Sequence, residues 1–197
     1  LKHGFRMLLI DERAHGRSEG EHIGLGNMDR LDGKRWIDWM VETAGEDVQI
    51  ILHGNSMGGA TVCMMSGLDL PPQVKGIISD CAFTSMKDVF THVLHSMYHI
   101  PAFPMLQLAD WANKKQVGYG LDDCNSAREV RRAKVPFLFI HGAEDVFVPC
   151  WMTEEIYKNC ASPKTKLIVG GAGHGESYYK DTEAYENAMD SFIGGVM

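Results

Sequence analysis

The stretch HGNSMGG, residues 53–59, decides the fold of this chain. It ends the short apolar run VQIILH (48–53) and opens the segment 56–66, which is apolar nearly all round. A buried strand, a sharp turn and a buried helix are therefore predicted in direct succession. The letters at the turn follow the pattern G-x-S-x-G, which requires this strand–turn–helix context.

Ser56 occupies the turn itself, and the geometry of the turn explains why glycines stand on both sides of it. A sharp strand-to-helix turn strains the backbone at Ser56, and we expect side chains at Gly54 and Gly58 to clash with neighbouring backbone. The turn lifts the serine hydroxyl clear of the sheet at a helix N-terminus. There the N–H of Met57 and the helix dipole can stabilise an oxyanion.

Four other runs have the same short, apolar character and are bounded by Gly, Asp or Pro: FRMLLID (5–11), VKGIISD (74–80), PFLFIH (136–141) and TKLIV (165–169). Near-continuous hydrophobicity is typical of strands that are buried on both faces of a parallel sheet. Helical patterns alternate with these runs, so we predict an α/β fold with a mostly parallel sheet flanked by helices.

Two of the predicted helices have clear ends. One carries an apolar stripe and ends at Gly45 as its C-cap. The last helix begins at Asp181 or Thr182. The inward-facing residues are predicted to be Leu31, Trp36, Ile37, Met40, Val41 and Ala44 in the first, and Tyr185, Ala188, Met189 and Phe192 in the second.

One segment interrupts the alternation of strands and helices. Residues 82–133 are too long for a single crossover helix and contain helical patterns at 86–97 and 105–113. We predict a helical lid inserted over the sheet edge of a single domain, residues 1–197. Its larger apolar residues are predicted to form the core of the lid or, alternatively, to line an acyl or aryl pocket. They are Met86, Phe90, Met97, Phe103, Met105 and Trp111.

Composition excludes several classes of protein. The 197 residues carry a formal net charge of −7, which argues against a nucleic-acid partner. Hydrophobic residues make up 45% of the chain and charged residues 23%, which is an ordinary composition for a globular protein. The five cysteines are odd in number and lack CxxC spacing, which indicates a reduced compartment and no metal framework. No run is long enough to span a membrane and no signal peptide is visible, so we expect a cytoplasmic location. The chain begins at Leu1, which is consistent with a fragment of a longer polypeptide.

A serine becomes a nucleophile only when a base removes its proton and an acid orients that base. Asp145 follows the run PFLFIHG, and His174 follows TKLIVGG. Because the carboxyl ends of parallel strands meet at one edge of a sheet, we expect Ser56, Asp145 and His174 to converge there. Glu144 is the competing acid but is predicted to point away. As an alternative, Asp145 caps the helix that begins near Pro149.

Other polar residues have weaker signals. His92, His95 and His99 would share one face of a helix, but no carboxylate or cysteine completes a metal site, so a polar lid face is predicted instead. His53 and His141 are predicted to be structural, and Arg13 to pair with a carboxylate of a loop.

The motifs HGNSMGG, HGAEDVFVP and GGAGHGES resemble the nucleophile, acid and base motifs of the α/β-hydrolase superfamily, and DERAHGRSEG is similar to its D-x-R-G-x-G-x-S loop. The resemblance extends from Asp11 to His174 and is closest to bacterial single-domain carboxylesterases and serine peptidase-like hydrolases, including cinnamoyl and feruloyl esterase-like members. Ala14 stands where that loop usually has glycine. The resemblance also implies further strands before residue 5, with a loop that donates a second oxyanion N–H.

These observations predict a serine hydrolase that cleaves small carboxylic esters through an acyl-enzyme. Ser56 is the expected nucleophile, His174 the base and Asp145 the acid, while Met57 donates to the oxyanion; no cofactor or metal is implied. A peptidase or amidase with the same triad and a non-catalytic binding protein of the same fold are the alternatives. The sequence leaves the acyl and alcohol groups and the oligomeric state open.

Overall fold

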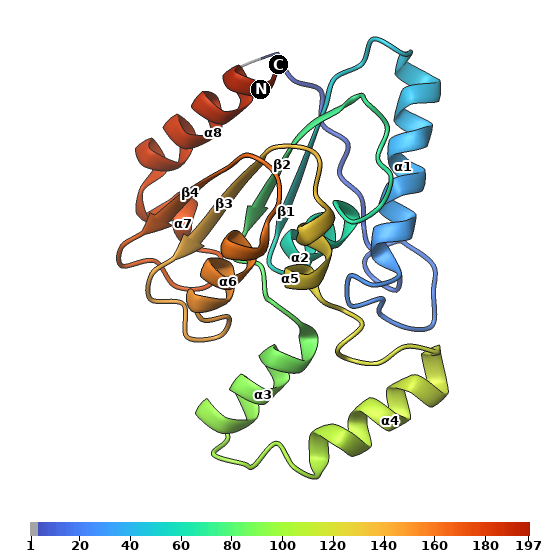
Figure 1. The fold of residues 1–197 in the computed structure, drawn as a ribbon, viewed down its shortest axis with the longest axis vertical. Coiled ribbons are helices and arrows are strands. Elements are labelled where there is room, and N and C mark those ends of the chain that lie inside the picture. Colours follow the sequence, from blue (N-terminus) through green and yellow to red (C-terminus); the bar gives the residue numbers. More distant parts are fainter. Residues whose placement is uncertain (1–3) are drawn as a thin grey trace.

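Four parallel strands form the centre of the molecule (Figure 1). The computed structural model describes residues 4–197. Its strands are β1 (Ile50–Asn55), β2 (Val74–Asp80), β3 (Phe137–Gly142) and β4 (Lys164–Val169), and they lie side by side in that order. The register pairs Asn55 with Asp80 and Gly142 with Val169, so the carboxyl ends of the strands lie at one edge of the sheet. The prediction of an α/β fold with a parallel sheet is confirmed.

Helices connect and cover the strands. In chain order they are α1 (Asp29–Ala44), α2 (Met57–Met65), α3 (Met86–Ser96), α4 (Met105–Val117), α5 (Ser126–Glu129), the 3₁₀ helix η1 (Val130–Arg132), α6 (Trp151–Asn159), α7 (Ser177–Lys180) and α8 (Thr182–Val196). Among residues 4–197, none of these helices combines the length and the hydropathy that crossing a membrane requires.

Neighbouring side chains along the strands point to opposite faces of the sheet, and each face has its own core. Ile77, Phe137 and Phe139 belong to the larger core, which includes residues of α1, α2 and α6. Ile78 and Leu138 face the smaller core beneath α8. Burial on both faces explains why the strands appear in the sequence as continuous apolar runs.

The predicted helix ends agree with the structure. Gly45 ends α1 with a φ of 96°, a conformation that glycine adopts without strain, and Asp181 accepts a hydrogen bond from the Ala184 N–H at the start of α8. The predicted inward residues of α8 pack on the smaller core. In α1 the prediction is wrong for Leu31, Trp36 and Ala44, because all three residues are exposed.

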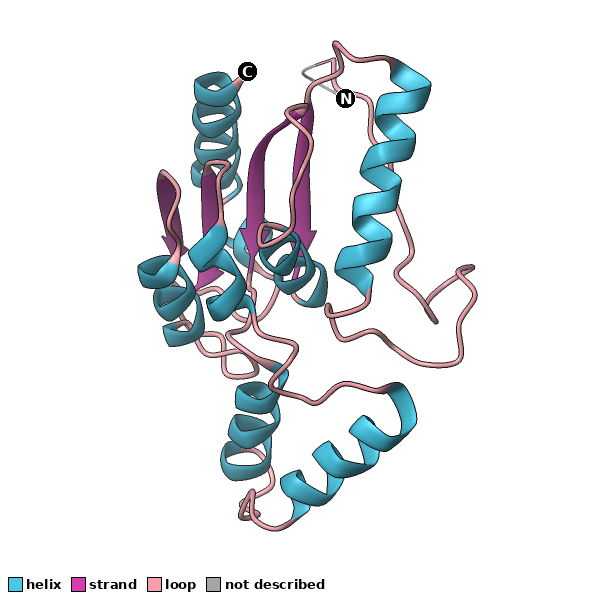
Figure 2. Cartoon of the chain, turned by 45° about the vertical axis from the view of Figure 1, so that its right-hand side comes forward, coloured by secondary structure: helices cyan, strands magenta, loops and turns pink. Residues whose placement is uncertain are grey.

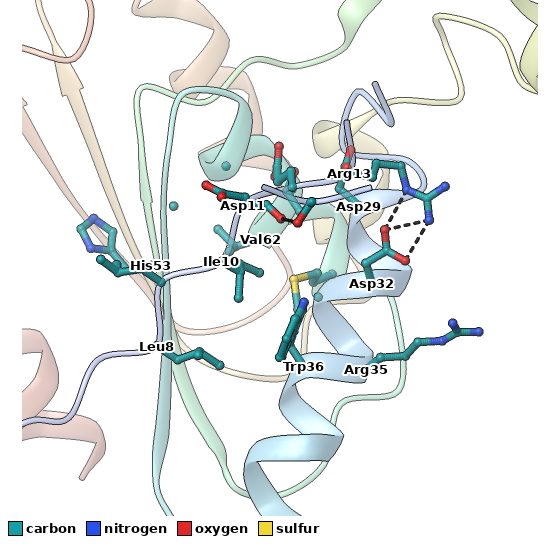
Figure 3. A pocket seen from close by; sticks show the side chains of 18 of the residues that line it. Leu8, Ile10, Asp11, Arg13, Asp29, Asp32, Arg35, Trp36, His53 and Val62 are labelled. Atoms are coloured by element: carbon teal, nitrogen blue, oxygen red, sulfur yellow. Dashed lines mark hydrogen bonds and ion pairs between the residues drawn. The ribbon is translucent and has the colours of Figure 1, made fainter. Parts of the chain in front are cut away.

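The prediction of a strand at residues 5–11 is wrong. This segment forms no ladder with β1, and the cavity shown in Figure 3, with a volume of about 890 Å³, lies between them. Leu8 and Ile10 line the cavity from one side, and Trp36 and His53 from others. Apolar residues favour a strand, but a strand exists only when a neighbouring backbone completes its hydrogen bonds. The three residues of the expected triad do not line this cavity.

The segment predicted as a lid insertion divides into two parts. Helices α3 and α4 project from the edge of the sheet where the strands end (Figures 1 and 2). In contrast, α5 packs against α2 and α6, and Leu121, Cys124 and Val130 belong to the larger core. The prediction of a lid core formed by the larger apolar residues holds only for Met86, since Phe90, Met97, Phe103, Met105 and Trp111 are exposed.

Candidate active site

The turn between β1 and α2 has the strained geometry that the sequence predicts. Ser56 has a φ of 53° and a ψ of −114°, a backbone conformation that residues other than glycine rarely adopt. Its backbone N–H donates to the carbonyl of Asp80 at 2.9 Å, which ties the turn to the neighbouring strand. Strain of this kind persists where the surrounding structure holds it, and it is concentrated at functional sites.

The close packing of the turn requires glycine at two positions, Gly54 and Gly59, whereas the sequence predicts Gly54 and Gly58. A Cβ atom at Gly54 would lie 2.1 Å from the carbonyl oxygen of Gly58, so glycine is required there. The predicted clash at Gly58 is wrong, because a Cβ at that position would meet no atom within 4 Å. Instead, a Cβ at Gly59 would lie 2.6 Å from the carbonyl oxygen of Asp80, where α2 packs closely on β2.

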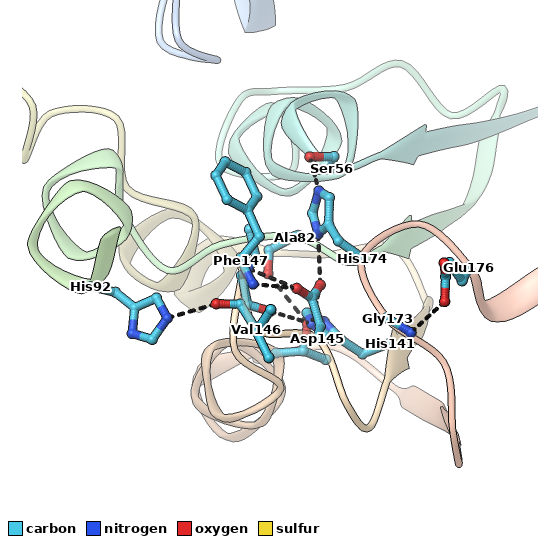
Figure 4. A network of polar contacts seen from close by, with 12 residues as sticks. Ser56, Ala82, His92, His141, Asp145, Val146, Phe147, Gly173, His174 and Glu176 are labelled. Atoms are coloured by element: carbon cyan, nitrogen blue, oxygen red, sulfur yellow. Dashed lines mark hydrogen bonds and ion pairs between the residues drawn. The ribbon is translucent and has the colours of Figure 1, made fainter. Parts of the chain in front are cut away.

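The structure brings Ser56, His174 and Asp145 into one chain of contacts (Figure 4). The Oγ atom of Ser56 lies 2.8 Å from Nε2 of His174, and Nδ1 of His174 lies 2.6 Å from Oδ2 of Asp145. The serine follows β1, the aspartate follows β3 and the histidine follows β4. Convergence at the carboxyl ends of the strands is the arrangement expected of a ligand site in a parallel sheet.

Asp145 is ionised by its surroundings. Burial raises the pKa of Asp145, but hydrogen bonds from His141, His174 and the Val148 N–H outweigh it and hold this pKa well below its usual range. A carboxylate only accepts hydrogen bonds, so Nδ1 of His174 carries the hydrogen that it shares with Asp145. The lone pair of Nε2 consequently faces Ser56, which is the orientation a general base needs.

The alternatives considered for Asp145 do not fit the structure. Its Oδ1 atom accepts hydrogen bonds from the N–H groups of Phe147 and Val148, at 2.9 and 2.8 Å. These close a turn before α6, whose first residue is Trp151, so Asp145 does not cap that helix. Glu144 is exposed, as predicted, and the carboxylate that contacts His174 is that of Asp145.

Met57 is the first residue of α2, directly after Ser56. The first N–H groups of a helix have no partner within the helix, so this group is one of the donors that a helix N-terminus offers to an anion. Holding an oxyanion remains a prediction for this N–H.

A second polar cluster lies behind the turn. Asp80 is buried at the end of β2 and accepts a hydrogen bond from the Tyr185 hydroxyl at 3.0 Å, and Tyr185 also lies 3.4 Å from Nε2 of His53. Burial raises the pKa of Asp80 and lowers the pKa of His53, in each case disfavouring the charged form. The contacts agree with the structural role predicted for His53.

His141 has a role that sequence reasoning underestimated. It is fully buried; its Nε2 atom donates to the carbonyl of Val148 at 2.8 Å and lies 3.3 Å from Oδ2 of Asp145. Its Nδ1 atom lies 2.7 Å from the hydroxyl of Thr153. His141 therefore supports the candidate acid directly. A histidine that ends a strand four positions before the acid is the local signal that could have indicated this contact.

The remaining polar predictions are partly corrected. Arg13 pairs with Asp32 through two contacts of 2.7 and 2.8 Å, but Asp32 belongs to α1 and not to a loop. His99 lies beyond the end of α3, so His92, His95 and His99 do not share one helix face. Ala14 has a φ of 58°, which explains why the related loop usually carries glycine there.

All five cysteines are free. Burial raises the pKa of the thiols of Cys63, Cys81 and Cys124 to about 12. These three side chains are therefore protonated at neutral pH and behave as small apolar groups.

A parallel sheet with a strained serine between strand and helix, followed along the chain by an aspartate and a histidine in contact, defines an α/β hydrolase. Residues 1–119 match the family described as serine aminopeptidase, S33, and the chain belongs to that family of hydrolases.

The chain is also similar to bacterial proteins over most of its length. The chain is 27% identical over 190 residues to the uncharacterized protein YqkD of Bacillus subtilis, covering 96% of this chain and 62% of that protein. The chain is also 25% identical over 190 residues to the uncharacterized protein Rv2307c of Mycobacterium tuberculosis, and this match covers 96% of this chain and 60% of that protein. The chain thus spans about three fifths of the length of these relatives.

Solved structures show the same fold. The esterase Pf2001 of Pyrococcus furiosus superimposes with a TM-score of 0.72 at 18% identity, covering 95% of this chain and 69% of that one. The acetyl xylan esterase of Paenibacillus sp. R4 gives a TM-score of 0.66 at 18% identity, and the match covers 95% of this chain and 60% of the esterase chain.

Proposed function

We propose that this protein is a serine hydrolase that cleaves carboxylic esters through an acyl-enzyme, in the manner of the single-domain carboxylesterases that its motifs resemble. The observation that carries the proposal is the continuous chain from Ser56 Oγ through His174 to Asp145, with contacts of 2.8 and 2.6 Å. Each contact is within the range at which a nucleophile, its base and an orienting acid cooperate.

The reaction proceeds in two halves. Ser56 Oγ attacks the ester carbonyl carbon while His174 Nε2 takes the hydroxyl proton, and Asp145 stabilises the resulting imidazolium. The carbonyl oxygen becomes an oxyanion, which the Met57 N–H stabilises. The tetrahedral intermediate collapses, the C–O bond to the alcohol breaks and His174 protonates the departing oxygen. Water then attacks the acyl-enzyme with His174 as base, which releases the acid and restores Ser56.

Two observations favour an ester over a peptide. The ring of Phe147 packs edge-on against the ring of His174 and is 41% exposed, and its neighbour Val146 is 73% exposed, so apolar surface adjoins the candidate base. This surface suits an apolar ester better than a charged peptide terminus. The solved structures that share the fold include an esterase and an acetyl xylan esterase, with TM-scores of 0.72 and 0.66, and an acylaminoacyl peptidase with the lower TM-score of 0.61. The alternative, a peptidase with the same triad, is favoured by the family description, which names a serine aminopeptidase.

Matched substrates distinguish these activities. We would measure hydrolysis of a p-nitrophenyl ester and a p-nitroanilide of the same acyl group, together with an aminoacyl anilide that has a free amine. The proposal expects faster turnover of the ester, abolished in Ser56→Ala. Equal or faster cleavage of the aminoacyl anilide would overturn it in favour of a peptidase. Binding without turnover, unchanged in Ser56→Ala, would indicate a non-catalytic protein.

A further inference from the structure

The loop that carries the candidate acid is held from two sides. We call residues 145–148 the acid loop. On the sheet side, His141 donates to the carbonyl of Val148 at 2.8 Å. On the other side, Nε2 of His92 lies 2.9 Å from the carbonyl oxygen of Val146, although 54 positions separate the two residues. Figure 4 shows His92 reaching this carbonyl from α3, the first helix of the projecting pair.

The hydrogens on His92 follow from its two contacts. A carbonyl oxygen only accepts, so Nε2 of His92 carries the hydrogen donated to Val146. Its Nδ1 atom lies 3.2 Å from the hydroxyl of Ser96, one turn further along α3. At its other end, α3 is capped by Ser85, whose hydroxyl accepts from the Asp88 N–H. The His92 ring is thus oriented on a helix that is itself anchored.

Val146 lies between the two residues of the acid loop that contact His174. On one side, Asp145 accepts the Nδ1 hydrogen bond of His174. On the other, the ring of Phe147 packs edge-on against the His174 ring, with centroids 5.1 Å apart and an interplanar angle of 69°. A shift of the Val146 carbonyl therefore displaces both contacts, and misplacement of a catalytic group by about 1 Å can cost on the order of 10²-fold in rate.

We propose that His92 is a positioning residue for this reaction: by holding the Val146 carbonyl, it sets the acid loop so that Asp145 and Phe147 both engage His174. The helical insertion thereby acts on the site through one donated hydrogen bond. This inference rests on the proposed function, because it requires His174 to be the base. His92 itself does not contact the substrate or exchange a proton.

Three variants test the role of the donor. His92→Phe keeps a ring and removes the N–H, whereas His92→Gln keeps an N–H donor at similar reach. His95 is exposed on the same helix, so His95→Phe is a matched control for replacing a histidine of α3. We expect His92→Phe to lower kcat for the ester by ~10- to 100-fold with KM nearly unchanged. His92→Gln should recover most of the loss, and His95→Phe should equal the parent.

The outcomes separate this inference from the proposed function. Parental kcat in His92→Phe, an equal loss in His92→Gln, or an equal loss in His95→Phe would each overturn the positioning role while leaving the hydrolase intact. A rise in KM without a fall in kcat would also overturn it, since it would place His92 in substrate binding. Thermal unfolding of each variant shows whether the fold is retained. An inactive parent whose Ser56 does not react with a fluorophosphonate would overturn the proposed function itself.

Discussion

Nδ1 of His174 lies 2.6 Å from Oδ2 of Asp145, and the side chain of Asp145 is fully buried. This contact fixes which nitrogen of His174 carries the hydrogen, and so directs the lone pair of the other nitrogen at Ser56. The ionised state of Asp145 depends on the donors around it, among them His141 and the Val148 N–H. The orientation of His174 toward Ser56 therefore depends on contacts that reach well beyond the three residues.

Replacing the acid by its amide tests this dependence. Asp145→Asn preserves the shape of the side chain but presents an amide that can donate toward His174, which favours the wrong tautomer. We expect kcat to fall on the order of 10⁴-fold. Steady-state ester hydrolysis measures this, with Glu144→Gln as the exposed neighbouring control. An equal loss in Glu144→Gln, or none in Asp145→Asn, would contradict the assignment of the acid.

The same carboxylate makes stability depend on pH. The pKa of Asp145 is lower in the folded protein than its ordinary value of 3.8. Asp145 therefore stabilises the fold above pH ~4, and this contribution is lost as the pH falls below that value. Urea unfolding of the parent and Asp145→Asn should give a difference in unfolding free energy that shrinks between pH 6 and pH 3. A difference independent of pH would contradict the ionised, buried state.

Two adjacent glycines provide a paired test of the turn. A Cβ at Gly59 would lie 2.6 Å from the Asp80 carbonyl oxygen, whereas one at Gly58 would meet nothing within 4 Å. Gly59→Ala should destabilise the protein by roughly 1–3 kcal/mol. Gly58→Ala should be neutral or stabilise it by up to about 1 kcal/mol, because alanine favours the helix. Denaturant unfolding measures both, and a larger loss in Gly58→Ala would contradict the packing of α2 on β2.

Backbone strain at Ser56 predicts a gain in stability when the strain is released. With a φ of 53° and a ψ of −114°, Ser56 adopts a backbone conformation that glycine tolerates far better. Ser56→Gly should therefore be more stable than Ser56→Ala by about 1 kcal/mol. Both variants lack the hydroxyl, so calorimetric unfolding compares the backbone alone. Equal melting temperatures would show that the turn is not strained.

The parts of the site that follow strand ends could be predicted from the sequence. Ser56, Asp145 and His174 each come directly after an apolar run, and parallel strands place such positions at one edge of the sheet. The contact of His141 with the acid loop left only a local signal, a histidine four positions before Asp145, and the contact of His92 could not be predicted at all. His92 lies 54 positions from Val146, and no local pattern reports which helix face meets a distant loop.

The failures have a common physical cause. The run at 5–11 has strand-like composition, but strand formation depends on a neighbouring backbone that β1 does not provide in this structure. Phe103 and Trp111 have large apolar side chains of the kind usually found in a core, but both are exposed on the projecting part of the chain. In each case the local sequence reports a preference for burial or pairing, and the tertiary arrangement decides whether it is met.

The most direct test of the central claim is the intact mass of the protein after incubation with a fluorophosphonate, measured beside Ser56→Ala. Such a probe reacts with a serine only when a base activates it. The proposed function predicts one adduct on the parent, located at Ser56, and none on the variant. A folded parent that gains no adduct, or a variant labelled as fully as the parent, would contradict it.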